Sequence, residues 1–217
     1  MSEDKGTEFR CGWVALMGPP NAGKSSLLNA FLGQKITIVT PKPQTTRNQI
    51  VGIFTDDKAQ IIFMDTPGLS QMRGQLSKAM LQAVRQSLGQ ANIVMLVLDA
   101  HLYIIHPEYL EKDLAQLAEN LAHDNRPLIV VANKIDMFAD KSRMLPLLDK
   151  LHEMWPHAEI FPVSALSGEG IPELRSFIEK HLPVSPPAFP EDQVSTASLR
   201  FMAAEIIREK LFMHLRQ

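Results

Sequence analysis

The segment that most constrains the fold is the glycine-rich stretch GPPNAGKSS at residues 18–26. It satisfies the pattern G-x-x-x-x-G-K-[ST], which a chain of this length matches by chance only about 1% of the time. An apolar run typical of a buried strand precedes it at residues 11–17, and SSLLNAFLG follows as a predicted helix ended by Gly33. This strand, loop and helix order predicts a phosphate-binding loop, and the alternative is an ordinary glycine turn with an exposed lysine.

The loop is expected to hold a phosphate through its backbone. The N–H groups of residues 20–25 surround an anion at a helix N-terminus, where unpaired donors and the helix dipole both favour negative charge. Lys24 is expected to reach the β- and γ-phosphates, and the Ser25 hydroxyl to bind Mg²⁺. The residues predicted to line the nucleotide here are Gly18, Pro20, Asn21, Ala22, Gly23, Lys24, Ser25 and Ser26.

Composition narrows the classes of protein. A formal net charge of −2 over 217 residues gives no overall basic surface, so an RNA partner would need a local patch. The absence of an apolar run of about 18 residues, and of a signal-peptide pattern at the start, predicts a cytoplasmic protein. The single cysteine, Cys11, is expected to be a small apolar residue of a core strand.

Strand-like and helical patterns alternate between residues 12 and 182, which predicts an α/β domain. We expect a mainly parallel six-stranded sheet with helices on both faces and the site at the carboxyl ends of the strands. Runs at Ile50–Thr55 and 60–65 are separated by DDKA, so one hairpin should supply one antiparallel strand. Residues 1–11 are interpreted as an N-terminal extension.

Residues 183–217 are interpreted as a separate linker and helix. The stretch LPVSPPAFPEDQVST contains four prolines and predicts an extended linker. An amphipathic helix is predicted over residues 197–215, with a broad apolar face that should dock against another surface. With that surface absent, we expect a monomer or weak self-association.

The segment NKID, which follows the predicted strand PLIVVA, indicates which nucleotide base the site prefers. The Asp136 carboxylate can accept from both the ring N–H and the exocyclic amine of guanine, which adenine cannot offer. Asn133 either meets the guanine carbonyl side or braces the phosphate loop, while the Lys134 stem lies over the base. The later segment SALSGEG is predicted to present the Ala165 N–H to the guanine oxygen, and the flanking residues Ser164 and Leu166 complete the predicted set.

Two further segments suit Mg²⁺ and the γ-phosphate. In DTPG, Asp65 fits a carboxylate near the metal, and the Gly68 N–H could bond a γ-phosphate oxygen. In PQTTRN, a threonine hydroxyl could complete the metal coordination, with Thr46 favoured over Thr45 and the choice left open. The alternatives are a simple turn after a strand and an ordinary solvated loop.

The segments GPPNAGKSS, MDTPGL, NKID and VSALSGEGI, in this order, resemble the translation-factor-type GTPases and most of all the Era-type GTPases. The resemblance covers nearly the whole chain; SLRFMAAEIIREKLF is similar to the connection into the second domain of that family, a KH-type RNA-binding module whose G-x-x-G loop does not follow here. It departs from the family at Ser26, where a threonine is common.

The resemblance implies a P-loop GTPase fold, GTP and GDP with Mg²⁺, and a role in maturation of the small ribosomal subunit. Binding of 16S rRNA is assigned by the resemblance to the KH domain, so direct RNA binding by this chain is expected to be weakened or lost. Peripheral membrane association is also implied, although nothing in this sequence supports it.

Hydrolysis is assigned to Lys24, Asn21, Thr46 and Gly68, with switch regions near residues 35–47 and 66–78. Leu69 stands where many GTPases carry a water-positioning glutamine, and Gln71 is offset, so intrinsic turnover should be slow. By the resemblance Asn21 helps to hold K⁺ beside the phosphates. The alternative, to which we give equal weight, is that asparagine stands here because it tolerates the left-handed backbone of the loop.

Two other functions stay open. One is a guanine-nucleotide-binding module with negligible hydrolysis that acts through partners. The other is a P-loop kinase or ATPase, against which the NKID segment argues. His101 and His106 are predicted to be surface residues of a loop with no metal to hold.

Overall fold

The computed structural model describes residues 8–37, 50–65, 89–121 and 124–214. Six strands form one sheet in the order β2-β3-β1-β4-β5-β6. Their bounds are β1 Arg10–Met17, β2 Ile50–Thr55, β3 Ala59–Asp65, β4 Ile93–Asp99, β5 Leu128–Asn133 and β6 Glu159–Pro162. Only β2 and β3 pair in antiparallel fashion, and the other neighbours are parallel. The predicted sheet, including its single hairpin, is confirmed.

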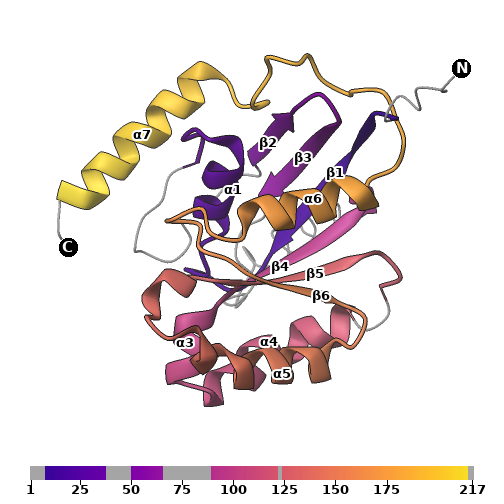
Figure 1. Ribbon diagram of the computed structural model, residues 1–217. Helices are drawn as coiled ribbons and strands as arrows, with labels where there is room; N and C mark the ends of the chain where they lie inside the picture. Colours follow the sequence, from indigo (N-terminus) through magenta and orange to yellow (C-terminus); the bar gives the residue numbers. More distant parts are fainter. Residues whose placement is uncertain (1–7, 38–49, 66–88, 122–123, 215–217) are drawn as a thin grey trace, which may run out of the picture.

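Helices cover both faces of the sheet, as predicted. They are α1 Lys24–Leu32, α3 Ala100–Ile105, α4 Glu108–Leu121, α5 Leu145–Met154, α6 Ile171–His181 and α7 Leu199–His214, with short 3₁₀ turns η2 Ile135–Met137 and η3 Lys141–Met144. In Figure 1, α1 and α6 lie on one face and α3, α4 and α5 on the other. Each set packs its leucines and aromatic side chains against the sheet in a separate apolar cluster. Within the described ranges, no helix has the length and apolar character needed to cross a membrane.

The parallel strands bring distant motifs to one edge of the sheet. The register sets Leu16 of β1 beside Asp65 of β3, and Asp99 of β4 beside Asn133 of β5. All these strands run in one direction, so the loops that follow β1, β3, β4, β5 and β6 share the same edge. This is where ligand sites form in open α/β sheets.

The prediction of a loop around His101 is wrong, because residues 100–105 form α3. The Asp99 carboxylate caps this helix by accepting from the Leu102 N–H at 3.0 Å. His101 is half-buried, with its ring 5.5 Å from that of Phe138. Asp99 is both the last residue of β4 and the N-cap of α3, so the helix follows the strand with no loop between them.

The proline-rich linker contains no helix, bends in a turn at residues 191–192, and is bound along the domain. The buried amide of Gln60 accepts from the N–H groups of Ala188 and Phe189 at 2.8 and 2.9 Å and donates to the Phe189 carbonyl at 2.9 Å. Farther along, the Ile53 N–H of β2 donates to the Val194 carbonyl at 2.9 Å. The linker therefore fixes where α7 begins.

The predicted helix after the linker is present, and its first turn docks on the domain. Phe201 and Met202 pack against the cluster that contains α1 and α6. Farther along α7, Ile206, Ile207 and Leu211 are 45%, 61% and 52% exposed. Exposed apolar surface on this helix was expected, and the resulting self-association stays a prediction.

Candidate nucleotide-binding site

The loop between β1 and α1 follows a path that glycine permits. Gly18 has φ 139°, and a Cβ there would lie 2.1 Å from the Val97 carbonyl oxygen. Gly23 has φ 93°, and Asn21 also adopts a positive φ of 61°. These left-handed angles are strained for most L-residues, although asparagine tolerates them better than others. The two motif glycines are thus explained by backbone geometry.

Lys24 is the first residue of α1 and its side chain is buried. Its ammonium group donates to the carbonyl oxygens of Gly18 at 3.0 Å and Pro19 at 2.8 Å. The positive charge therefore lies against the start of the loop, at a helix N-terminus that already favours an anion. Both features suit the β- and γ-phosphates of a nucleotide.

Asn133 at the end of β5 joins two loops. Its amide donates to the Ala22 carbonyl of the phosphate loop at 2.9 Å, and its oxygen accepts from the Ala165 N–H at 3.0 Å. Of the two roles left open for Asn133, bracing the phosphate loop is the one that this geometry favours. Because the Ala165 N–H is engaged by Asn133, a guanine oxygen would have to share that donor.

Asp136 is exposed, and its carboxylate is oriented by a buried serine. The Ser164 hydroxyl donates to Asp136 Oδ1 at 2.6 Å and accepts from the Ser167 N–H at 3.0 Å. Asp136 Oδ2 and the second lone pair of Oδ1 remain for the two donors of a ligand. Leu166, two residues beyond Ser164, is 86% exposed and its side chain makes little contact with the domain.

Lys134 has a left-handed backbone with φ 70°, and its ammonium group pairs with Asp99 Oδ2 at 2.5 Å. Asp99 thus both caps α3 and holds the side chain that the sequence assigns to the face of the base. Sequence reasoning missed Asp99 and the Ser164 to Asp136 contact. The signal for Asp99 was available, since Asp99 and Asn133 both end adjacent parallel strands.

The residues assigned to Mg²⁺ come from separate segments. Ser25 lies in the first turn of α1, and its carbonyl accepts from the hydroxyl of buried Thr37 at 3.0 Å. The β1–β3 register brings the backbone of Asp65 beside Leu16, two residues before the phosphate loop. A serine hydroxyl and an aspartate carboxylate are hard oxygen donors of the kind that Mg²⁺ prefers. Thr45, Thr46, Gly68, Leu69 and Gln71 lie outside the described residues.

Taken together, these loops can bind an anion at one end and discriminate a base at the other. The phosphate loop and Lys24 supply positive potential, and Asp136 supplies two oxygens that can accept hydrogen bonds from the edge of a base. Asn133 fixes the distance between the two parts. Such an arrangement favours a nucleoside phosphate whose base offers two adjacent donors, which is the edge of guanine.

Comparison with known proteins agrees with this geometry. A sequence model of the family described as "50S ribosome-binding GTPase" matches residues 13–134. GTPase Era of Desulfovibrio desulfuricans is 72% identical over 209 residues, which cover 96% of this chain and 68% of the relative. GTPase Era of Nitratidesulfovibrio vulgaris is 58% identical, with 97% of this chain and 69% of the relative covered.

Solved structures give the same result. Aquifex aeolicus Era bound to GDP and AlF4⁻ superposes with a TM-score of 0.84 at 40% identity, over 94% of this chain and 68% of the other. An Era complex with MgGDPNP and nucleotides 1506–1542 of 16S ribosomal RNA gives a TM-score of 0.82 at 39% identity, with the same coverage.

Proposed function

Because the chain belongs to the Era family of GTPases, it binds and hydrolyses GTP, and we propose that its phosphate loop and its base-binding loops perform separate parts of this task. The phosphate loop with Lys24 holds the phosphates, and Asp136 reads the guanine edge. The observation that carries the proposal is the Asn133 side chain, which bonds Ala22 on the phosphate side and Ala165 on the base side.

Hydrolysis by these residues is mainly a matter of positioning and charge. Ser25, Asp65 and Thr46 are the residues that would hold Mg²⁺, which when bound supplies positive charge to the phosphate oxygens. Lys24 adds a fixed charge at the same phosphates, and the Gly68 N–H is assigned to the γ-phosphate. With Leu69 in place of a glutamine, no side chain at that position can orient water, so we expect slow turnover.

We propose that K⁺ raises this turnover through Asn21. GTP hydrolysis is expected to be about tenfold or more faster in K⁺ than in Na⁺, because a cation beside the phosphates supplies charge as the bond breaks. The measurement is single-turnover phosphate release in each salt at equal ionic strength. Equal rates in the two salts would refute the assignment.

The variant Asn21→Gly separates the two interpretations of Asn21. Glycine adopts the φ of 61° seen there without strain but removes the side-chain oxygen. If the side chain helps to hold K⁺, this variant loses the preference for K⁺ over Na⁺. If asparagine only suits the backbone, Asn21→Gly keeps both the rate and the preference of the wild type.

We further propose that the switch serves assembly of the small ribosomal subunit in the cytoplasm. Support comes from the related Era structure that contains a segment of 16S ribosomal RNA. The net charge of −2 argues that strong RNA contact is not a general property of this chain's surface. We therefore expect the nucleotide state to control a weak association.

Co-sedimentation with purified ribosomal subunits tests this role. The chain is expected to pellet with small subunits more in the presence of a non-hydrolysable GTP analogue than with GDP, and only at micromolar concentration or above. Large subunits serve as the control, since the matching family is described by binding to 50S particles. Pelleting that ignores the nucleotide, or that favours large subunits, would contradict the proposal.

A further inference from the structure

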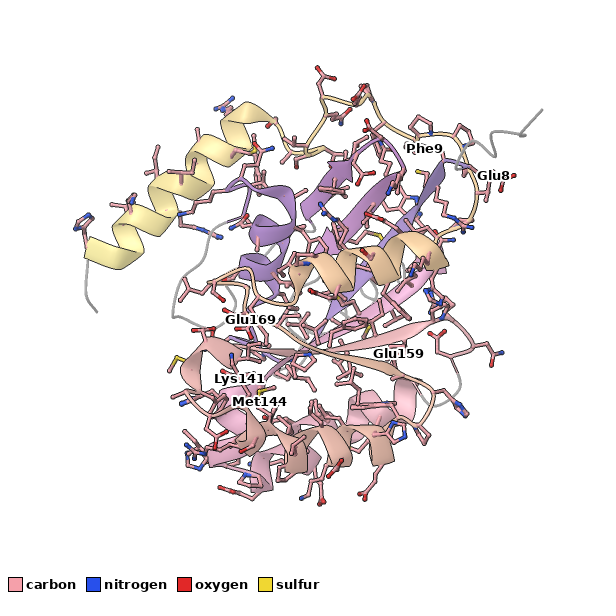
Figure 2. The ribbon with its side chains drawn as sticks, viewed as in Figure 1. Glu8, Phe9, Lys141, Met144, Glu159 and Glu169 are labelled. Carbon is pink, nitrogen blue, oxygen red and sulfur yellow. The ribbon has the colours of Figure 1, made fainter. Side chains whose placement is uncertain are left out.

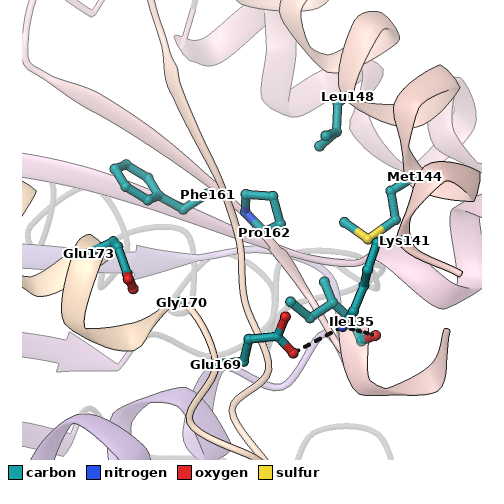
Figure 3. A pocket seen from close by; sticks show the side chains of 9 residues that line it. All are labelled: Ile135, Lys141, Met144, Leu148, Phe161, Pro162, Glu169, Gly170 and Glu173. Atoms are coloured by element: carbon teal, nitrogen blue, oxygen red, sulfur yellow. Dashed lines mark hydrogen bonds and ion pairs between the residues drawn. The ribbon is translucent and has the colours of Figure 1, made fainter. Parts of the chain in front are cut away.

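One lysine outside the predicted site contacts both loops that are assigned to the guanine base. Lys141, the first residue of η3, donates from Nζ to the Ile135 carbonyl at 2.9 Å and to Glu169 Oε2 at 3.0 Å (Figure 3). Ile135 belongs to NKID and Glu169 to SALSGEG. Figure 2 labels Lys141 and Glu169 in the whole domain.

The backbone of Lys141 is held firmly. The Asp140 carboxylate caps η3 by accepting from the Ser142 N–H at 2.9 Å, and hydrogen bonds from Ser142 hold the pKa of Asp140 below its ordinary value. Met144, at the end of η3, is buried in the core below α5. The lysine therefore extends from a fixed point.

Glu169 is connected in turn to the residue that orients Asp136. Its carbonyl accepts from the Ser164 N–H at 2.9 Å, and the Ser164 hydroxyl donates to Asp136. Gly168 and Gly170, on either side of Glu169, have φ of 82° and 79°. Glycine leaves the backbone of this loop permissive, so a side-chain contact from Glu169 can restrict it.

A closed circuit results. It runs from Asp136 through Ser164 and Glu169 to Lys141, and back through the Ile135 carbonyl to Asp136. The Lys141–Glu169 pair also forms part of the wall of a groove of about 550 Å³ between η3 and α6. Glu173 lines the same groove and lies apart from Lys141 (Figure 3), so it offers a matched carboxylate that is not in the circuit.

We propose that Lys141 and Glu169 form a positioning pair that holds Asp136 and Ala165 at the spacing that guanine requires. The inference rests on the guanine-nucleotide function proposed above, and neither side chain needs to touch the nucleotide. Their side chains are 44% and 53% exposed, so solvent and salt weaken the pair. Its effect on nucleotide release is accordingly moderate and depends on ionic strength.

The test is the rate of release of a fluorescent GDP from Glu169→Gln, which keeps the size of the side chain and removes its charge. At low salt this variant is expected to release GDP about two- to fivefold faster than the wild type, as for an exposed ion pair. The difference should disappear near 1 M salt, where the screening length is about 3 Å. Lys141→Met should release GDP faster still, since it also loses the Ile135 carbonyl contact, and Lys141→Arg should restore most of the wild-type rate.

Base selectivity separates positioning from general loosening. IDP lacks the exocyclic amine, so displacement of Asp136 costs GDP two hydrogen bonds and IDP one. The ratio of GDP to IDP affinity should therefore fall in Glu169→Gln and stay unchanged in Glu173→Gln. The proposal is overturned if Glu169→Gln releases GDP at the wild-type rate in low salt, or if the acceleration is equal for the two nucleotides. Failure of the wild type to bind GDP would instead refute the proposed function.

Discussion

Replacement of Asp136 by asparagine is expected to change the preferred base from guanine to xanthine. The wild-type carboxylate can accept from two guanine donors, and Ser164 holds its Oδ1 at 2.6 Å. In Asp136→Asn the side-chain carbonyl oxygen can keep the serine contact. The side-chain amide NH₂ repels the exocyclic amine of guanine and donates to the carbonyl of xanthine. Loss of two charge-assisted hydrogen bonds lowers GTP affinity by about 100-fold or more.

Titration with GTP and xanthosine triphosphate, each with Mg²⁺, measures this change. The matched control is Asp140→Asn, an exposed aspartate that caps η3 and that asparagine replaces equally well as a cap. The control should keep the preference of the wild type for GTP. If Asp136→Asn binds GTP as tightly as the control does, Asp136 does not read the base.

Substitution of Gly23 by alanine is expected to abolish tight nucleotide binding. A Cβ at this position would lie 2.2 Å from Asn133 Nδ2, so Asn133 would have to leave the Ala22 carbonyl. The φ of 93° adds backbone strain. Breaking the only side-chain brace that we assign between the phosphate and base loops should lower GTP and GDP affinity on the order of 100-fold.

Gly33→Ala provides the comparison. Gly33 also has a positive φ, 63°, but a Cβ there meets nothing within 4 Å. It should therefore lower stability by about 1 kcal/mol and leave nucleotide affinity unchanged. Circular dichroism melts and nucleotide titrations of both variants distinguish the two effects. Equal nucleotide affinity for Gly23→Ala and Gly33→Ala would contradict the role given to Asn133.

Local patterns were enough to predict the frame of the fold. The apolar run before Gly18, the helix that Gly33 ends and the DDKA turn between β2 and β3 each carry their own signal within a few residues. The mostly parallel sheet follows because strands alternate with helices. These elements needed no knowledge of distant contacts.

The contacts that build the site connect residues far apart in the sequence, which is why sequence patterns left them open. Asn133 meets Ala22 across 111 positions, and Ser164 meets Asp136 across 28. Gln60 binds the linker from 129 positions away and looked like an ordinary polar residue of a strand. Hydrogen-bond partners of this kind depend on strand order and register, which local periodicity does not encode.

These loops are expected to select guanine over other bases. The most direct measurement is a competitive titration of the wild-type chain with GTP and ATP in the presence of Mg²⁺. A site built to hydrogen-bond the guanine edge should prefer GTP about 1,000-fold or more, because adenine leaves the Asp136 carboxylate without its donors. Equal affinity for ATP and GTP would contradict the claim.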